Sequence, residues 1–109
     1  MNSKEPYKLV EKREGCINAS LKVIGDKWTG LIVRDLATET QRFSHLQQSL
    51  RGISPRTLSE RLDRLQACGV ITKQVYAEVP PRTEYSLTPK GRDLLPILEA
   101  MADWGLKYL

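Results

Sequence analysis

The segment from residue 53 to residue 65 constrains the fold of this chain more than any other, because it combines a helix start with an apolar stripe. Ser54 is a favourable N-cap residue, and Pro55 suits the first helical position, where no N–H is needed. Leucines then recur at helical spacing, at Leu58, Leu62 and Leu65. The segment predicts a short helix over residues 54–68 with an apolar back.

The opposite face of this predicted helix is polar and rich in arginine, which suits the major groove of DNA. Arginine can form two hydrogen bonds to guanine or hold a phosphate, and a glutamate can accept from cytosine or pair with an arginine. The predicted DNA-binding residues of the helix are Ser54, Arg56, Thr57, Glu60, Arg61 and Arg64. The alternative is a solvated charged face, as on any surface helix. The neighbouring elements favour DNA.

The residues before this helix predict a helix-turn-helix. The expected elements are a flexible charged arm (residues 1–15), two helices (16–25 and 27–37), a short strand (42–44) and a brief helix capped by Ser44. Gly52 then provides a tight turn into the arginine-rich helix. Two helices joined by a short turn with glycine form the helix-turn-helix motif, here over residues 43–68.

The period changes from helical to alternating after the arginine-rich helix, which predicts a β-hairpin over residues 71–87. β-branched residues favour a strand over residues 71–76, and a second strand follows at residues 83–87. Pro80 and Pro81 stiffen the tip, because proline has no donor for strand pairing. The hairpin is interpreted as a wing beside the helix-turn-helix.

The wing carries two further predicted DNA-binding residues, Lys73 and Arg82. Arg82 could reach a phosphate or enter the minor groove, and Lys73 could contact a phosphate. The alternative is a hairpin whose tip only protects an exposed sheet edge.

The last helix is predicted over residues 89–108, with a bend at Pro96, because the missing N–H leaves the carbonyl of Arg92 without a donor. Its apolar residues cover more than one face, although a surface helix of a small domain needs a single stripe. We therefore expect a homodimer. The predicted interface residues of the first and last helices are Ile17, Leu21, Leu94, Leu98, Met101, Trp104 and Tyr108.

Together these elements predict an α+β, mainly helical domain over residues 16–109. It is a winged helix-turn-helix with a two-stranded β-hairpin wing and flanking N- and C-terminal dimerisation helices. A twofold dimer would place its two arginine-rich helices one DNA turn apart, about 34 Å, and would bind a pseudo-palindromic site on double-stranded DNA.

Composition excludes several classes of protein. The 109 residues suit one domain, and the net charge of +4 is compatible with a polyanionic partner. No run of about 18 apolar residues exists, so no contact with a membrane is expected. Two cysteines and one histidine are too few for a disulfide framework or a metal cluster, which favours the reducing cytoplasm and predicts neither metal nor cofactor.

Cys16 is the one candidate for a reactive group. It lies at the start of the first predicted helix, where the helix dipole favours a negative charge such as a thiolate. The alternative is an unreactive small residue that packs under the helix.

Several segments in a fixed order resemble the HxlR-type winged-helix transcription regulators of bacteria and archaea. They are Gly25-Asp26-Lys27-Trp28, Arg42-Phe43-Ser44-His45-Leu46, residues 52–62, residues 75–88, Lys90-Gly91 and Trp104-Gly105. The resemblance implies a homodimeric DNA-binding regulator, often a repressor. Some members sense electrophiles or oxidants through a cysteine just before the first helix, where Cys16 lies, although Ile17 here stands in place of the usual proline.

Two other functions remain open at this point. One is a protein-interaction module that keeps the winged fold without binding DNA. The other is a thiol enzyme that uses Cys16, but the sequence shows no base or cofactor loop to support it, and we expect no enzymatic activity. For a regulator, modification of Cys16 or a small ligand at the dimer interface would alter the affinity for DNA.

Overall fold

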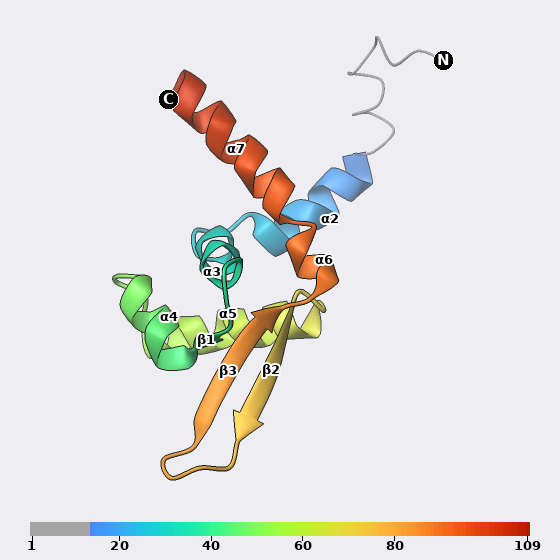
Figure 1. The fold of residues 1–109 in the computed structure, drawn as a ribbon. Coiled ribbons are helices and arrows are strands. Elements are labelled where there is room, and N and C mark those ends of the chain that lie inside the picture. Colours follow the sequence, from blue (N-terminus) through green and yellow to red (C-terminus); the bar gives the residue numbers. More distant parts are fainter. Residues whose placement is uncertain (1–13) are drawn as a thin grey trace.

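The computed structural model describes residues 14–109 and has the predicted order of helices and strands (Figure 1). Most of the expected flexible arm lies outside the described residues, and the first helix of the described part begins within it, at Glu14. The elements are α2 (Glu14–Ile24), α3 (Thr29–Leu36), β1 (Gln41–Arg42), α4 (Phe43–Ser49), α5 (Pro55–Ala67), β2 (Ile71–Tyr76), β3 (Arg82–Leu87), α6 (Pro89–Arg92) and α7 (Leu95–Tyr108). This winged-helix architecture confirms the predicted fold class.

The hairpin is part of a three-stranded antiparallel sheet with the order β1-β3-β2. Strands β2 and β3 pair from Ile71 opposite Leu87 to Tyr76 opposite Arg82. Strand β1 pairs with the other edge of β3, where Gln41 lies opposite Tyr85. The short strand predicted at residues 42–44 is β1, which ends at Arg42, but the sequence did not show that it joins the hairpin as a third strand.

The hydrophobic core lies between α3, α4, α5 and the sheet. Its fully buried members include Ile32 and Leu36 of α3, Leu46 of α4 and Ile71 of β2. The leucine stripe of α5 completes the core, with Leu58, Leu62 and Leu65 all at most 2% exposed. Burial of these leucines directs the remaining circumference of α5 to solvent.

Helix α5 begins and ends as its sequence predicts. The Ser54 side chain accepts a hydrogen bond from the backbone N–H of Thr57 at 3.0 Å, and Pro55 occupies the first turn. The helix ends at Ala67, and Gly69 follows with a φ of +76°, a conformation that favours glycine. Gly52, with a φ of +88°, makes the turn between α4 and α5.

Two helix starts differ from the prediction. Helix α3 begins at Thr29 instead of residue 27, because the Asp26 carboxylate accepts hydrogen bonds from the backbone N–H groups of Trp28 and Thr29. Helix α4 begins at Phe43 with Arg42 at the cap position, so the predicted cap at Ser44 is wrong. Pairing of β1 with β3 extends the chain up to Arg42, which is why the helix starts directly after it.

The predicted last helix is interrupted, not bent. Helix α6 ends at Arg92, and α7 begins at Leu95, with Pro96 in its first turn. Proline at that position has no N–H to offer the carbonyl of Arg92, and the first turn of a helix accommodates it without loss.

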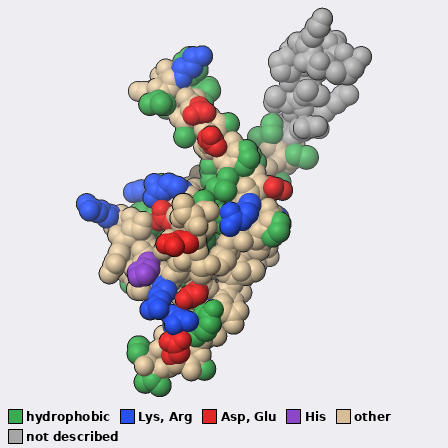
Figure 2. Space-filling model, in the orientation of Figure 1, with side chains coloured by type: hydrophobic (Ala, Val, Ile, Leu, Met, Phe, Trp, Pro, Cys, Tyr) green, Lys and Arg blue, Asp and Glu red, His purple; other side chains and the backbone are tan. Residues whose placement is uncertain are grey.

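Helices α2 and α7 extend from one end of the body, while the tip of the hairpin lies at the opposite end (Figure 1). Hydrophobic side chains are exposed along the projecting α7 (Figure 2). Within residues 14–109, no helix is both long enough and apolar enough to cross a membrane.

Candidate nucleic-acid interface

The exposed side of α5 carries two arginines that are open to solvent, Arg56 and Arg64. The side chain of Arg56 is 89% exposed, and its Nε lies 3.1 Å from Oε1 of Glu60, one turn further on. An exposed ion pair of this kind contributes at most about 1 kcal/mol, so it leaves Arg56 available for another acceptor. Both arginines and Glu60 are therefore exposed to solvent on one side of α5.

Ser54 and Thr57 have a structural task at the start of α5. The Ser54 hydroxyl donates to Oγ1 of Thr57 at 2.9 Å while it accepts from the Thr57 N–H. The second bond satisfies a helix-end N–H that would otherwise lack a partner. Thr57 is half-buried and Ser54 is exposed.

Arg61 is oriented differently from the other arginines of α5. Its Nε lies 3.3 Å from Oδ1 of Asp26, and the two side chains are only 28% and 18% exposed. The prediction that Arg61 reaches the DNA major groove assumed that it lies on the exposed face of α5 with Arg56 and Arg64. In the structure, its guanidinium faces the turn between α2 and α3.

Asp26 is held at that turn by several partners. Besides two backbone N–H groups, its carboxylate accepts from the Thr29 hydroxyl at 2.6 Å, and Thr29 itself is buried. Burial alone would raise the pKa of Asp26, but the hydrogen bonds from Thr29 and Trp28 and the charge of Arg61 outweigh it, so the pKa lies below its usual value. Asp26 is therefore charged at neutral pH.

The two predicted wing residues also differ in environment. Lys73 on β2 is exposed. Arg82 is 24% exposed and forms ion pairs with Glu78 at 2.8 Å and Glu84 at 3.0 Å, while its guanidinium carbon lies 4.1 Å from the ring centre of Tyr76. Two carboxylates thus offset the charge of Arg82, whereas Lys73 faces water.

The structure adds basic residues that the sequence reading left out. Arg42 and Arg51 are exposed at the two ends of α4. A small hollow of about 200 Å³ is lined by Arg42, Phe43 and Ser44 and by Arg82 and Thr83, the first two residues of β3 near the tip of the wing. The sequence could have indicated Arg42 as a candidate contact, since it directly precedes the first helix of the helix-turn-helix, but we predicted it only as part of a strand.

Cys16 lies on the exposed side of α2, in a hollow of about 380 Å³ between α2 and α7. Ile17 and Leu21 of α2 and Ile97 and Met101 of α7 line the same hollow, and all four are large apolar residues at least 41% exposed. Ile97 was absent from the predicted interface. Cys68, in contrast, is half-buried at the C-terminal end of α5.

The predicted dimer residues of the last helices divide into two groups. Trp104 and Tyr108 are 59% and 61% exposed, and their ring centres lie 5.4 Å apart. Leu94 and Leu98 are half-buried and pack against the core of their own chain. The break before α7 directs these two leucines inward, which the assumption of one continuous helix did not anticipate.

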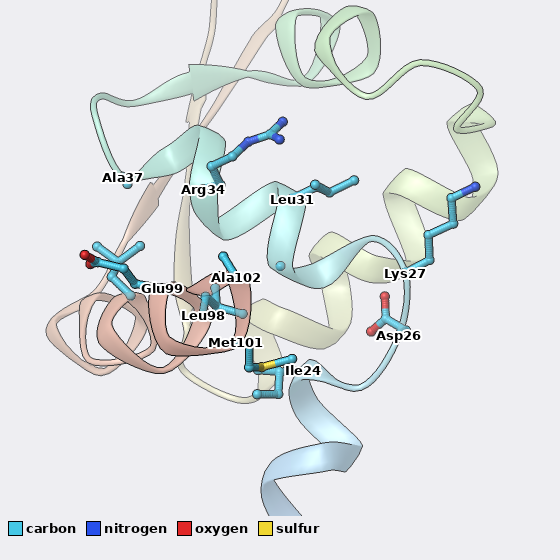
Figure 3. Close-up of a pocket in the computed structure, with 12 residues that line it drawn as sticks. Ile24, Asp26, Lys27, Leu31, Arg34, Ala37, Leu98, Glu99, Met101 and Ala102 are labelled. Carbon is cyan, nitrogen blue, oxygen red and sulfur yellow. The ribbon is translucent and has the colours of Figure 1, made fainter. Parts of the chain in front are cut away.

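A larger hollow of about 640 Å³ lies between α3 and α7 (Figure 3). Leu98 and Ala102 extend from α7 toward α3, and Met101 meets Ile24 where α2 approaches α7 (Figure 3). Asp26 lies at the edge of the hollow. Within the described part of the chain, no group of three or more metal-ligating side chains is present.

The family model of HxlR-like helix-turn-helix proteins matches residues 23–109. The chain belongs to this family. It is 42% identical to the HTH-type transcriptional regulator YdeP of Bacillus subtilis over 96 residues, which cover 87% of this chain and 75% of YdeP.

Solved structures of transcription regulators share the fold of this chain. A MarR-family transcriptional regulator from Porphyromonas gingivalis superposes with a TM-score of 0.79 at 39% identity and covers 85% of this chain and 91% of its own. The redox regulator HypR in its reduced form superposes with a TM-score of 0.79 at 37% identity and covers 84% of this chain and 90% of its own.

Membership in the HxlR-like family establishes this chain as a transcriptional regulator with a helix-turn-helix DNA-binding domain. The family and its relatives are transcriptional regulators and not enzymes, which confirms that prediction and sets the thiol-enzyme alternative aside.

Asp26 gives a prediction about acid stability. Because its folded-state pKa is lowered, Asp26 stabilises the fold fully above its unfolded-state value of about 3.9, and this stabilisation is lost as pH falls through the lower folded-state value. Asp26→Asn is expected to destabilise the protein by about 1 kcal/mol at pH 7, and by progressively less as pH falls below 4.

Urea unfolding of both proteins from pH 7 to pH 2.5 measures this difference. Asp103→Asn, which changes an exposed carboxylate on α7, serves as the control and is expected to leave stability unchanged. If the wild type were more stable than Asp26→Asn by the same amount at pH 2.5 as at pH 7, the prediction would be wrong.

Proposed function

We propose that this HxlR-like regulator binds a specific site on double-stranded DNA as a homodimer and represses transcription by covering a promoter. The observation that supports this most strongly is the exposed face of α5, with Arg56 and Arg64 in solvent and the opposite leucines buried. A helix with this division fits the major groove with its polar side outward from the protein.

Within this proposal the predicted contact residues have different tasks. Arg56 and Arg64 contact base edges or phosphates, and Glu60 orients Arg56 or accepts from cytosine. Thr57 and Ser54 lie at the N-terminal end of α5, the end that approaches the bases in helix-turn-helix complexes. Lys73 contacts a phosphate. Arg82 is held by Glu78 and Glu84 and stabilises the wing, and it approaches the DNA backbone only if one of these two glutamates releases it.

The homodimer of the proposal forms through α2 and α7. These helices project from the body on the side opposite the hairpin tip and expose Ile17, Leu21, Met101, Trp104 and Tyr108. Exposed apolar surface of this extent typically marks an interaction site. A twofold axis between the copies would place two α5 helices on successive major grooves of a pseudo-palindromic operator.

Regulation is proposed at the same interface. Cys16 shares its hollow with four of the exposed apolar residues of α2 and α7, so an added group on its sulfur would change how the two copies pack. The similarity to the redox regulator HypR supports this task for the thiol. A small apolar ligand in the hollow between α3 and α7 is the second candidate effector, since 640 Å³ is a usual size for a ligand pocket.

The contact assignment predicts distinct effects for different cations. On the operator selected from genomic fragments, Arg56→Ala and Arg64→Ala are each expected to weaken binding by about 1–3 kcal/mol and to relax the sequence preference. Lys73→Ala should weaken binding to the operator and to an unrelated duplex by the same factor. Fluorescence anisotropy at fixed salt measures both duplexes, with Lys107→Ala at the far end of α7 as the control. Wild-type operator affinity in both arginine variants would refute the assignment.

The dimer proposal predicts that α7 determines the oligomeric state. Trp104→Glu should produce a monomer, because Trp104 lies on the stripe with Ile97, Met101 and Tyr108, and a carboxylate there cannot be buried without a partner. Leu106→Glu changes an even more exposed apolar residue off this stripe, 88% exposed against 59% for Trp104, and should remain dimeric. Sedimentation equilibrium distinguishes the two, and a monomeric wild type would contradict the proposal.

The thiol proposal predicts a response that depends on Cys16. The cysteine thiolate adds to the double bond of N-ethylmaleimide and forms a stable thioether. This modification should weaken operator binding about fivefold or more in the wild type and in Cys68→Ser. Cys16→Ser should keep its affinity after the same treatment. Mass spectrometry confirms which cysteine carries the adduct. Equal loss of binding in Cys16→Ser would remove Cys16 from the regulatory mechanism.

A further inference from the structure

The turn Gly25-Asp26-Lys27-Trp28 contacts α5 through one charged pair. Asp26 and Arg61 join the turn between α2 and α3 to the middle of α5, with 3.3 Å between Oδ1 and Nε. Neither the capping of α3 nor the exposed face of α5 requires this pair. The pair therefore joins two elements that are far apart in the chain without a part in either of those two features.

Both members of the pair are held in one geometry. The Asp26 carboxylate accepts three hydrogen bonds, from the N–H groups of Trp28 and Thr29 and from the Thr29 hydroxyl, so it cannot follow a movement of α5. Nε of Arg61 is buried and makes no hydrogen bond of good geometry, so charge attraction is what joins it to Asp26. A partly buried attraction of this kind is less screened than one at the surface.

Arg61 lies on α5 between residues that are proposed to contact DNA, so a constraint on Arg61 also constrains their positions. It lies one turn after Thr57 and one turn before Arg64, and it neighbours both on the helix surface. Leu58 and Leu62 hold the back of α5 by apolar contact, which is not directional. A fixed charge at the side of the helix adds the direction that apolar packing lacks.

We propose that the Asp26–Arg61 pair is a positioning device that sets the rotation of α5 about its axis, and that Arg61 itself does not touch DNA. This inference rests on the proposed function, because it assumes that α5 reads base edges. Base recognition requires side chains within about 0.5 Å of the productive place, so a small rotation of α5 costs specific affinity while leaving phosphate attraction unchanged.

A double-mutant cycle on operator binding tests this inference. Asp26→Asn keeps the shape of the cap, since asparagine is also a good capping residue and the Thr29 hydroxyl can accept as well as donate. Arg61→Gln removes the other charge. Each variant is expected to bind the operator about tenfold more weakly, the double variant no more weakly than either, and Arg61→Lys, which keeps the charge, close to wild type.

Two further readouts separate positioning from other tasks. Affinity for an unrelated duplex and the slope of log K against log salt should stay at wild-type values, because no phosphate contact is lost. Circular dichroism at the assay temperature shows that all variants are folded. Arg56→Ala, measured beside them, reports on the proposed function itself.

Several results would overturn the inference. A larger loss in Arg61→Gln than in Asp26→Asn, additive in the double variant and with a salt slope reduced by about one, would show that Arg61 contacts DNA directly. Full operator affinity in folded but less stable variants would show a purely structural pair. If neither the wild type nor Arg56→Ala prefers any duplex, the proposed function fails first, and positioning for DNA fails with it.

Discussion

Burial of the leucine face of α5 against α3, α4 and the sheet is the interaction on which the rest of this structure depends. Leu58, Leu62 and Leu65 are almost completely buried, and each such side chain contributes about 1.5–3 kcal/mol, more than any exposed ion pair of the same helix. Because these leucines determine which side of α5 faces inward, they also determine that Arg56 and Arg64 face solvent. The site is thus a consequence of the core.

Charge divides the arginines of this regulator into two kinds. Arg56 and Arg64 extend into water, where a single exposed glutamate is the nearest partner of Arg56. Arg61 and Arg82 are less than 30% exposed and face carboxylates, and both have an Nε that is buried without a hydrogen bond. The net charge of +4 therefore says little about the site, since part of the positive charge joins α5 to the turn before α3 and β3 to the tip of its hairpin.

The parts of the fold that were predictable from the sequence are those with local causes. The start of α5 follows from Ser54 and Pro55, and its end from Gly69. The hairpin follows from alternation and from the prolines at its tip. The start of α3 and the break before α7 were missed, although Asp26 and Pro96 are both visible in the sequence, because a proline can either bend a helix or begin a new one, and an aspartate before a helix does not by itself fix the first helical residue.

By itself, the sequence determined the type and order of the elements, the polar and apolar faces of α5, and the resemblance to one family. Periodicity, caps and prolines act over a few residues, so they can be read from neighbours in the chain. Only the tertiary structure decided that Arg61 faces Asp26, that Arg82 lies between two glutamates, that β1 joins β3, and that Leu98 faces inward while Trp104 stays exposed. These outcomes depend on which distant segments meet, and in each case the partner across the fold, not the residue alone, determines its environment.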